Sequence, residues 1–221
     1  MTWVKICGMT NLEDALVAAD VGADAVGFVF YEKSPRNVNV EAAREIIRQL
    51  PKQLEKVGVF VNKAEDFIDL VIEKTAITAV QMHGDDEDPR VADLIMKRRS
   101  DIKILPAISM KRPNPAGWAM MWHPDSVCAF LLDSGGNGKH GGTGQSFDWR
   151  SSTDSVDAIR SIGKLVAAGG LCPANVGEAI ATLRPWGVDV VSGVEASPGK
   201  KDPEKVRAFV RAVREYDRRT V

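Results

Sequence analysis

The stretch WVKICGMTNLEDALVAA (residues 3–19) contains a short apolar strand followed directly by a helix. Its first six residues, WVKICG, are mostly apolar, which favours a strand. The run Thr10-Asn11-Leu12-Glu13 is a capping box, so the helix is predicted to begin there. Apolar side chains then recur at helical spacing and are expected to form its buried face: Leu12, Ala15, Leu16 and Ala19. A strand followed by a helix is the repeating unit of α/β folds.

Seven further short apolar runs follow along the chain, and helical or irregular spacers separate them. The eight predicted strands lie in WVKICG (3–8), AVGFVF (25–30), KVGVFVN (56–62), AVQMHG (79–84), KILPAIS (103–109), AFLLDS (129–134), KLVAAGG (164–170) and VDVVSGVE (188–195). Eight such units in 221 residues favour a closed (β/α)8 barrel, the TIM-barrel architecture, over an open doubly wound sheet. We therefore predict an α/β protein in which residues 1–221 form a single barrel domain.

The spacers predict helices with different clarity. Residues 41–51 (EAAREIIRQLP) carry one apolar stripe and end at Pro51. The last helix is expected to begin with Asp202 as N-cap and Pro203 at its first position. Its buried face should contain Val206, Phe209, Val210 and Val213. Residues 110–126 carry three prolines and residues 135–157 are rich in glycine and serine, so the fifth and sixth helices are the least clearly predicted.

The composition argues against several classes of function. The 29 lysines and arginines balance 30 aspartates and glutamates, so the chain lacks the positive field that nucleic-acid binding uses. Its three cysteines form no CxxC pair, which argues against a disulfide framework and a thiolate metal site. No window approaches the length of apolar sequence that a membrane span needs. These features predict a cytoplasmic protein that binds no nucleic acid, no membrane and no metal.

The predicted strand ends carry polar side chains on the face that points into the barrel. Successive strand residues point to opposite faces, and in such barrels the active site lies where the strands end. From this alternation, six polar side chains are expected to point inward: Lys5, Cys7, Gln81, His83, Asp133 and Asp189. A thiol, an imidazole and two carboxylates are therefore expected to converge at one mouth of the barrel.

Each of these side chains also has a purely structural interpretation. A lone cysteine in an apolar strand is usually a small buried hydrophobic residue, and parity alone favours that interpretation for Cys7. His83 can be a satisfied residue at a strand end, and Asp133 can serve a cap or a turn as readily as catalysis. For Lys5 we expect a structural role, as a buried ion-pair partner.

Glycine-containing stretches at strand ends are candidates for binding phosphate. The segment GGNGKHGGTG (135–144) matches the spacing of a dinucleotide fingerprint, but no helix opens at its third glycine, and it also departs from a Walker P-loop. An active-site loop is the simpler interpretation. Gly169-Gly170 and Ser192-Gly193 end the seventh and eighth predicted strands, where barrels bind phosphate through backbone amides. The alternative is that these glycines only turn the chain.

Eight motifs, spread from the first predicted strand to the last, resemble those of the phosphoribosylanthranilate isomerase family. They are KICGMTNLEDA, GADAVGFVFYEKSPR, VGVFVN, VQMHG, LLDS, GGTGQSFDW, AAGGLCPANV and VDVVSGVEASPGKKD, in this order between Lys5 and Asp202. The resemblance implies a cofactor-free Amadori rearrangement in tryptophan biosynthesis. Its phosphorylated small-molecule substrate would be N-(5-phosphoribosyl)anthranilate, and its product 1-(2-carboxyphenylamino)-1-deoxyribulose 5-phosphate.

The resemblance also implies roles for three reactive or charged side chains. Cys7 in KICG corresponds to the general base that removes the proton from ribose C2, and Asp133 in LLD to the general acid that protonates the ring oxygen. Arg36 in SPR corresponds to the residue that binds the anthranilate carboxylate, and a guanidinium suits such a planar partner. In these roles the pKa of Cys7 must fall towards neutrality and that of Asp133 must rise.

The remaining matched residues would hold the substrate. His83 and Asp189 lie in family motifs near the substrate. Four residues correspond to the phosphate-binding residues of the family: Gly169, Gly170, Ser192 and Gly193. Many relatives carry two serines before GVE, but this chain has Val191-Ser192, so one hydroxyl is missing there.

Two other functions remain open at this stage. One is the related aminoaldose isomerase of histidine biosynthesis, alone or as a second activity, although Cys7 replaces the aspartate that this enzyme uses at the end of its first strand. The other is a non-catalytic barrel that binds phosphorylated ligands. The sequence also leaves open whether the protein is a monomer or a homodimer.

Overall fold

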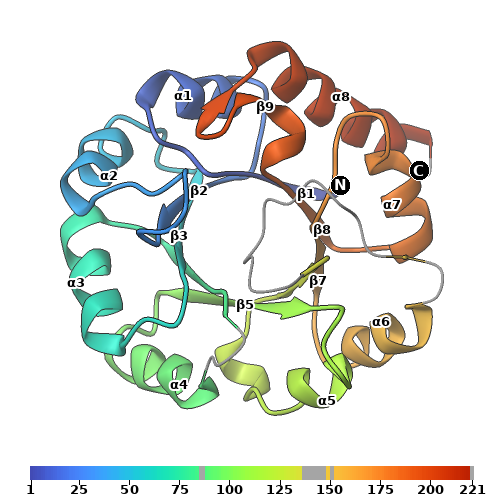
Figure 1. The fold of residues 1–221 in the computed structure, drawn as a ribbon, viewed down its shortest axis with the longest axis horizontal. Helices are drawn as coiled ribbons and strands as arrows, with labels where there is room; N and C mark the ends of the chain where they lie inside the picture. The colour runs from blue at the N-terminus through green and yellow to red at the C-terminus, as the bar shows by residue number, and fades with distance from the viewer. Residues whose placement is uncertain (85–87, 136–147, 150–151, 220–221) are drawn as a thin grey trace.

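Eight parallel strands close into a barrel within the part of the chain that the structure describes (Figure 1). The structure is a computed structural model that describes residues 1–84, 88–135, 148–149 and 152–219. The strands are β1 (Trp3–Cys7), β2 (Ala25–Phe30), β3 (Glu55–Phe60), β4 (Ala79–Met82), β5 (Lys103–Ser109), β6 (Phe130–Asp133), β7 (Leu165–Ala167) and β8 (Gly187–Val190). Because β1 pairs with both β2 and β8, the sheet closes on itself. The predicted (β/α)8 barrel is confirmed, and the single-domain organisation of residues 1–221 stays a prediction.

Helices form a ring around the outside of this barrel (Figure 1). They are α1 (Leu12–Asp20), α2 (Val40–Ile47), α3 (Glu65–Thr75), α4 (Pro89–Arg98), α5 (Pro115–Ala119), α6 (Thr153–Arg160), α7 (Val176–Leu183) and α8 (Pro203–Arg219). Short 3-10 turns η1 (Pro124–Ser126) and η2 (Ser192–Val194) and a hairpin of β9 (Glu195–Ser197) with β10 (Lys200–Lys201) complete the described elements.

Two apolar layers stabilise the barrel. Val4 and Ile6 of β1 point outward and are fully buried against the helices, as their parity predicts. Inward-facing residues form clusters inside the barrel, among them Ala25, Val57, Ala79 and Leu105, and a second group of Ala107, Ala129, Leu131, Val166 and Ala168. The interior is therefore packed with side chains, as is usual for barrels of this class.

α1 begins one residue later than the predicted capping box. Asn11 rather than Thr10 is the N-cap, and its side-chain oxygen accepts the backbone N–H of Asp14 at 2.9 Å. The helix turns Asp14 inward, where its carboxylate accepts the backbone N–H of Lys201 at 2.7 Å. Leu16 is consequently 36% exposed, so the predicted apolar face is wrong at that position.

The other helices follow the sequence more closely. In α8, Asp202 accepts the backbone N–H of Glu204 at 2.9 Å, as expected of an N-cap before Pro203. The predicted inner face of α8 is confirmed, because all four of its apolar residues are buried. α5 has only five residues, in agreement with its weak sequence pattern.

The hairpin after β8 was not predicted. Pro198 and Gly199 form its turn, and Gly199 has a φ of 83°, which suits glycine after proline in such a turn. The Gly199 carbonyl accepts the Thr10 hydroxyl at 2.5 Å, which ties the hairpin to the start of α1. The hairpin leaves the charged side chains of Glu195 and Lys201 buried.

None of the helices in the described residues combines the length and the apolar character that crossing a membrane requires.

Candidate active site

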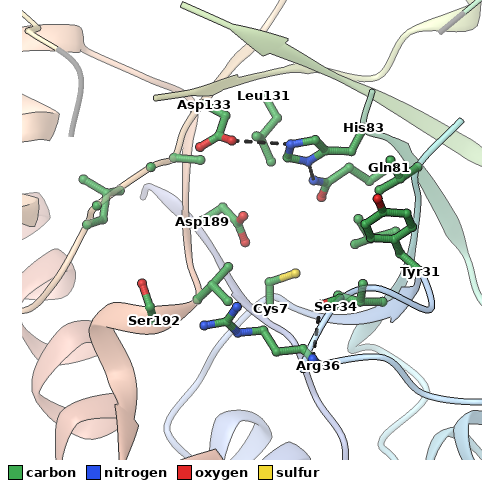
Figure 2. A pocket seen from close by; sticks show the side chains of 18 residues that line it. Cys7, Tyr31, Ser34, Arg36, Gln81, His83, Leu131, Asp133, Asp189 and Ser192 are labelled. Atoms are coloured by element: carbon green, nitrogen blue, oxygen red, sulfur yellow. Dashed lines mark hydrogen bonds and ion pairs between the residues drawn. The ribbon is translucent and has the colours of Figure 1, made fainter. Parts of the chain in front are cut away.

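The strands end at a cavity lined by polar side chains (Figure 2). Eight of the nine predicted site residues line it: Cys7, Arg36, His83, Asp133, Gly169, Gly170, Asp189 and Ser192. Gly193 lies behind the wall, where a Cβ would overlap the carbonyl oxygen of Leu171. A concave site with convergent polar groups at the strand ends suits a small-molecule ligand.

Cys7 is the last residue of β1, and its sulfur lies against a glycine of the neighbouring strand. Cys7 pairs in register with Gly27 of β2, and a Cβ on Gly27 would lie only 2.5 Å from the Cys7 sulfur. The same Cβ would lie 3.1 Å from Lys5 Cε. Glycine at this position therefore leaves room for the thiol and the lysine side chain together.

Lys5 is fully buried and shared between Asp189 and Cys7. Its ammonium group donates to Asp189 Oδ1 at 2.8 Å and lies close enough to Cys7 for the two groups to interact electrostatically. Burial lowers the pKa of Lys5, but Asp189 and Cys7 outweigh burial and raise this pKa above its ordinary value. The expectation that Lys5 is a buried ion-pair partner is confirmed.

The pKa of Cys7 lies above its ordinary value, which corrects the expectation of a fall. Burial is the main cause, since the thiol is only 3% exposed, and the nearby carboxylate of Asp189 adds to it. Lys5 and Lys201 act in the opposite direction and lower this pKa. The two lysines are thus the groups that favour the thiolate form.

Asp133 ends β6 and faces an imidazole ring across one wall of the cavity. His83 Nε2 lies 3.4 Å from Asp133 Oδ2, and Gln81 Nε2 lies 3.2 Å from His83 Nδ1. With the Gln81 amide donating to Nδ1, the proton of the neutral ring lies on Nε2, towards Asp133. Figure 2 shows the three side chains in a row along this wall.

The pKa of Asp133 lies below its ordinary value, so the expected rise is also corrected. Burial raises the pKa, but the His83 ring near Oδ2 and the backbone N–H groups of Ser134 and Gly135 lower it by more. Asp133 is therefore a carboxylate at neutral pH although it is buried. Its charge is stabilised by His83, which follows β4, and by backbone donors of the turn after β6.

Arg36 follows β2 and is held by a carboxylate of the hairpin. Its Nε donates to Glu195 Oε1 at 2.8 Å and its Nη2 to Glu195 Oε2 at 2.7 Å. Lys201 Nζ donates to the same Oε1 at 3.2 Å and to the carbonyl of Val191 at 3.2 Å. Among the described residues Nη1 of Arg36 has no hydrogen-bond partner, so this N–H group remains available to a ligand.

The loop after β7 presents backbone with little side-chain obstruction. Gly169 and Gly170 have φ values of 78° and 68°, and a Cβ on Gly169 would lie 2.5 Å from the backbone nitrogen of Ser134. Asn175 fixes the loop, because its amide donates to the Gly170 carbonyl at 3.0 Å and accepts the N–H of Cys172 at 2.8 Å. The loop leads directly into the N-terminus of α7, a place that favours anions.

The glycine-rich segment 135–144 lies outside the described residues except for Gly135. Its interpretation as an active-site loop therefore stays a prediction.

Sequence reasoning missed the residues that support the site from behind: Gly27, Asn175, Glu195 and Lys201. The Pro-Gly pair at 198–199 is a turn signal and could have shown that the chain doubles back before α8. No local pattern marks Glu195 as the partner of Arg36, because the two residues are 159 positions apart.

The fold and the cavity define the class of this protein as a (β/α)8-barrel enzyme whose polar groups gather at the strand ends. The model of the N-(5'-phosphoribosyl)anthranilate (PRA) isomerase family matches residues 4–212. The chain belongs to this family, whose members are isomerases of tryptophan biosynthesis.

Individual relatives agree with this assignment. The N-(5'-phosphoribosyl)anthranilate isomerase of Geobacter sp. (strain M21) is 46% identical over 211 residues, 95% of this chain and 97% of the relative. A solved structure of monomers generated from dimeric phosphoribosylanthranilate isomerase of Thermotoga maritima has a TM-score of 0.82 and 39% identity, covering 97% of this chain and 100% of its own. A phosphoribosylanthranilate isomerase solved in complex with reduced 1-(o-carboxyphenylamino)-1-deoxyribulose 5-phosphate has a TM-score of 0.81 and 38% identity, with the same coverage.

Proposed function

We propose that this cavity isomerises N-(5-phosphoribosyl)anthranilate to 1-(2-carboxyphenylamino)-1-deoxyribulose 5-phosphate without a cofactor, with Cys7 as general base and Asp133 as general acid. One observation carries the proposal: Cys7 and Asp133 line the same cavity from β1 and β6, and Figure 2 shows them on opposite sides of it. Such a placement suits a reaction in which one group removes a proton from the sugar and another delivers one.

In the proposed reaction no atom is gained or lost. Asp133 protonates the ring oxygen, the bond between that oxygen and C1 breaks, and the nitrogen lone pair forms a C1=N double bond. The Cys7 thiolate then takes the proton from C2, which gives an enolamine. The enolamine takes up a proton at C1 and its 2-hydroxyl becomes the ketone of the product.

Asp133 must carry a proton before it can act as the acid. In the structure its hydrogen-bond donors favour the carboxylate. The substrate brings a phosphate and a carboxylate into the same cavity, and nearby negative charge raises the pKa of a carboxyl group. We propose that substrate binding thereby raises the pKa of Asp133, while His83 keeps its carboxyl group oriented.

The test of this function is turnover by the purified protein in the presence of a chelator. We expect the fluorescence of phosphoribosylanthranilate to disappear and a product of unchanged mass to accumulate. Undiminished fluorescence with a folded protein would overturn the proposal.

Arg36 is proposed to bind the anthranilate carboxylate through the N–H groups that Glu195 leaves available. Replacing Arg36 with alanine should raise KM, and the Kd of the reduced product, by about 10–100-fold, because charge-assisted hydrogen bonds are lost. The fold should persist, since Lys201 still neutralises Glu195. Calorimetry with the reduced product and steady-state kinetics measure the two constants, and Arg207→Ala on the outer surface of α8 is the control. An unchanged KM would remove the assignment.

The phosphate is proposed to bind at Gly169, Gly170 and Ser192, with Gly193 shaping the wall from behind. Gly193→Ala should push the loop at Leu171 away and raise the Kd of the reduced product by about 10–100-fold, since small misplacements of binding groups cost this much. Gly177→Ala is the matched control, because a Cβ there meets no atom within 4 Å. Equal affinities of the two variants would contradict the location of the phosphate site.

We propose further that residues 1–221 act as one catalytic domain in the cytoplasm, where a phosphorylated small molecule is the partner. Whether the protein acts as a monomer or as a homodimer is decided by its mass in solution.

A further inference from the structure

Five charged side chains lie around the end of β1 at Cys7: Lys5 of β1, Arg36 after β2, Asp189 of β8, and Glu195 and Lys201 of the hairpin. All five are largely buried, and Lys5 and Lys201 are 0% and 1% exposed. Bulk water therefore screens their charges only weakly.

The pairing of these groups leaves one positive charge without a partner. Lys5 pairs with Asp189 at 2.8 Å. Arg36 and Lys201 both pair with the single carboxylate of Glu195, at 2.7 and 3.2 Å. Three cations thus form ion pairs with only two carboxylates; the buried carboxylate of Asp14 contacts Lys201 through the backbone N–H, at 2.7 Å, and is not part of these ion pairs. The strand on the other side of Cys7, β2, contributes only Gly27 at this level.

We infer that the Cys7 thiolate is the third anion of this cluster and that Lys201, which does not touch the cavity, is a positioning residue that keeps Cys7 ionisable. This inference rests on the proposed role of Cys7 as general base. A buried cation without a counter-ion is costly, so the cations of the cluster act against the effect of burial and favour the thiolate.

The electrostatics of the individual groups agree with this charge count. Burial raises the pKa of Cys7, whereas Lys5 and Lys201 lower it. Burial lowers the pKa of Lys201, while Glu195 and Cys7 raise it in part. Burial raises the pKa of Glu195, but Arg36 and Lys201 lower it by more, so Glu195 stays ionised. Its single negative charge is paired with both Arg36 and Lys201.

The charge count predicts that two substitutions shift the pKa of Cys7 in opposite directions. Lys201→Met removes a cation and should raise the pKa of Cys7 by about one unit, whereas Asp189→Asn removes an anion and should lower it by a similar amount. Lys201→Arg keeps the charge and should leave this pKa nearly unchanged. In Lys201→Met, Glu195 keeps its two hydrogen bonds to Arg36, so we expect the protein to fold.

The test is a titration of the thiolate by its ultraviolet absorbance in the intact protein. Each variant is measured against the same variant with Cys7→Ser, so that Cys128 and Cys172 cancel. The inference is supported if the pKa of Cys7 moves up in Lys201→Met and down in Asp189→Asn. An unchanged pKa in Lys201→Met, or a shift of the same sign in both variants, would overturn it. If Lys201→Met does not fold, Asp189→Asn alone decides.

Kinetics separate this inference from the proposed function. If both hold, the rise of kcat with pH should move upward by the same shift in Lys201→Met, and activity should recover at higher pH. A merely structural role of Lys201 would lower activity equally at every pH. If the thiol titrations move as predicted but activity ignores them, the charge cluster stands and the base assignment of Cys7 fails.

Discussion

Replacing Cys7 with alanine is expected to lower kcat by about 10²–10⁴-fold, the usual contribution of a general base, while the barrel remains folded. The sulfur lines the cavity from the end of β1, where Lys5 reaches it. Alanine fills the same place against Gly27 without a group that can take the proton from C2. Stopped-flow or steady-state assays with phosphoribosylanthranilate measure the decrease in kcat.

Two further variants test whether the loss of activity is due to the thiol of Cys7. Cys7→Ser should be nearly as inactive, because a serine hydroxyl ionises far less readily than a thiol. Cys128→Ala replaces a half-buried cysteine that does not line the cavity and should keep wild-type kcat. Wild-type turnover by a folded Cys7→Ala protein would remove Cys7 from the mechanism.

The pH dependence of the wild-type enzyme follows from the environment of Cys7. The base acts only when it is deprotonated, and burial raises the pKa of Cys7 above its ordinary value. In the substrate complex, where the proposed rise of the Asp133 pKa keeps the acid protonated, kcat should therefore increase as the pH rises towards the pKa of Cys7.

Asp133→Asn is expected to lower kcat by a similar factor of about 10²–10⁴, because an amide keeps the shape of the carboxyl group but cannot protonate the ring oxygen. The backbone N–H groups of Ser134 and Gly135 can still donate to the amide oxygen, so the turn after β6 should persist. His83→Asn should lower kcat less, since His83 orients the acid and does not replace it. Product formation and thermal unfolding are measured for each variant.

The control for this substitution is Asp93→Asn. Asp93 lies on α4, outside the cavity, and accepts a hydrogen bond from Ser126 at 2.7 Å. It should cost some stability and no turnover. If Asp133→Asn retained full activity, another group would have to be the acid.

The sequence predicted the positions of the reactive side chains because a strand alternates its residues with a period of two. Counting from Val4 to Cys7, and along FLLD to Asp133, needs no knowledge of the rest of the chain. The structure places these groups on one cavity for that reason. The (β/α)8 barrel was predictable in the same way, because each unit has its own pattern.

The protonation states could not be predicted, since they depend on donors that are distant in the sequence. His83, which follows β4, lowers the pKa of Asp133, and burial of Cys7 results from the packing of the whole barrel. The buried charge network could not be predicted for the same reason. Lys201 and Glu195 face Arg36 only because the unpredicted hairpin turns at Gly199.

The N-cap of α1 shows a smaller, local limit. Thr10 and Asn11 are both good capping residues, so the sequence alone does not decide between them. In the structure the Thr10 hydroxyl bonds the hairpin instead of the helix, and Asn11 is the N-cap.

The most direct test of the central claim is a comparison of two substrates by the wild-type protein, with a chelator present. Phosphoribosylanthranilate and the aminoaldose of histidine biosynthesis are offered side by side at equal concentration. We predict rapid conversion of phosphoribosylanthranilate to a product of the same mass, and far slower conversion of the other aminoaldose. Conversion of the histidine-pathway substrate alone, or of neither substrate by a folded protein, would contradict the account.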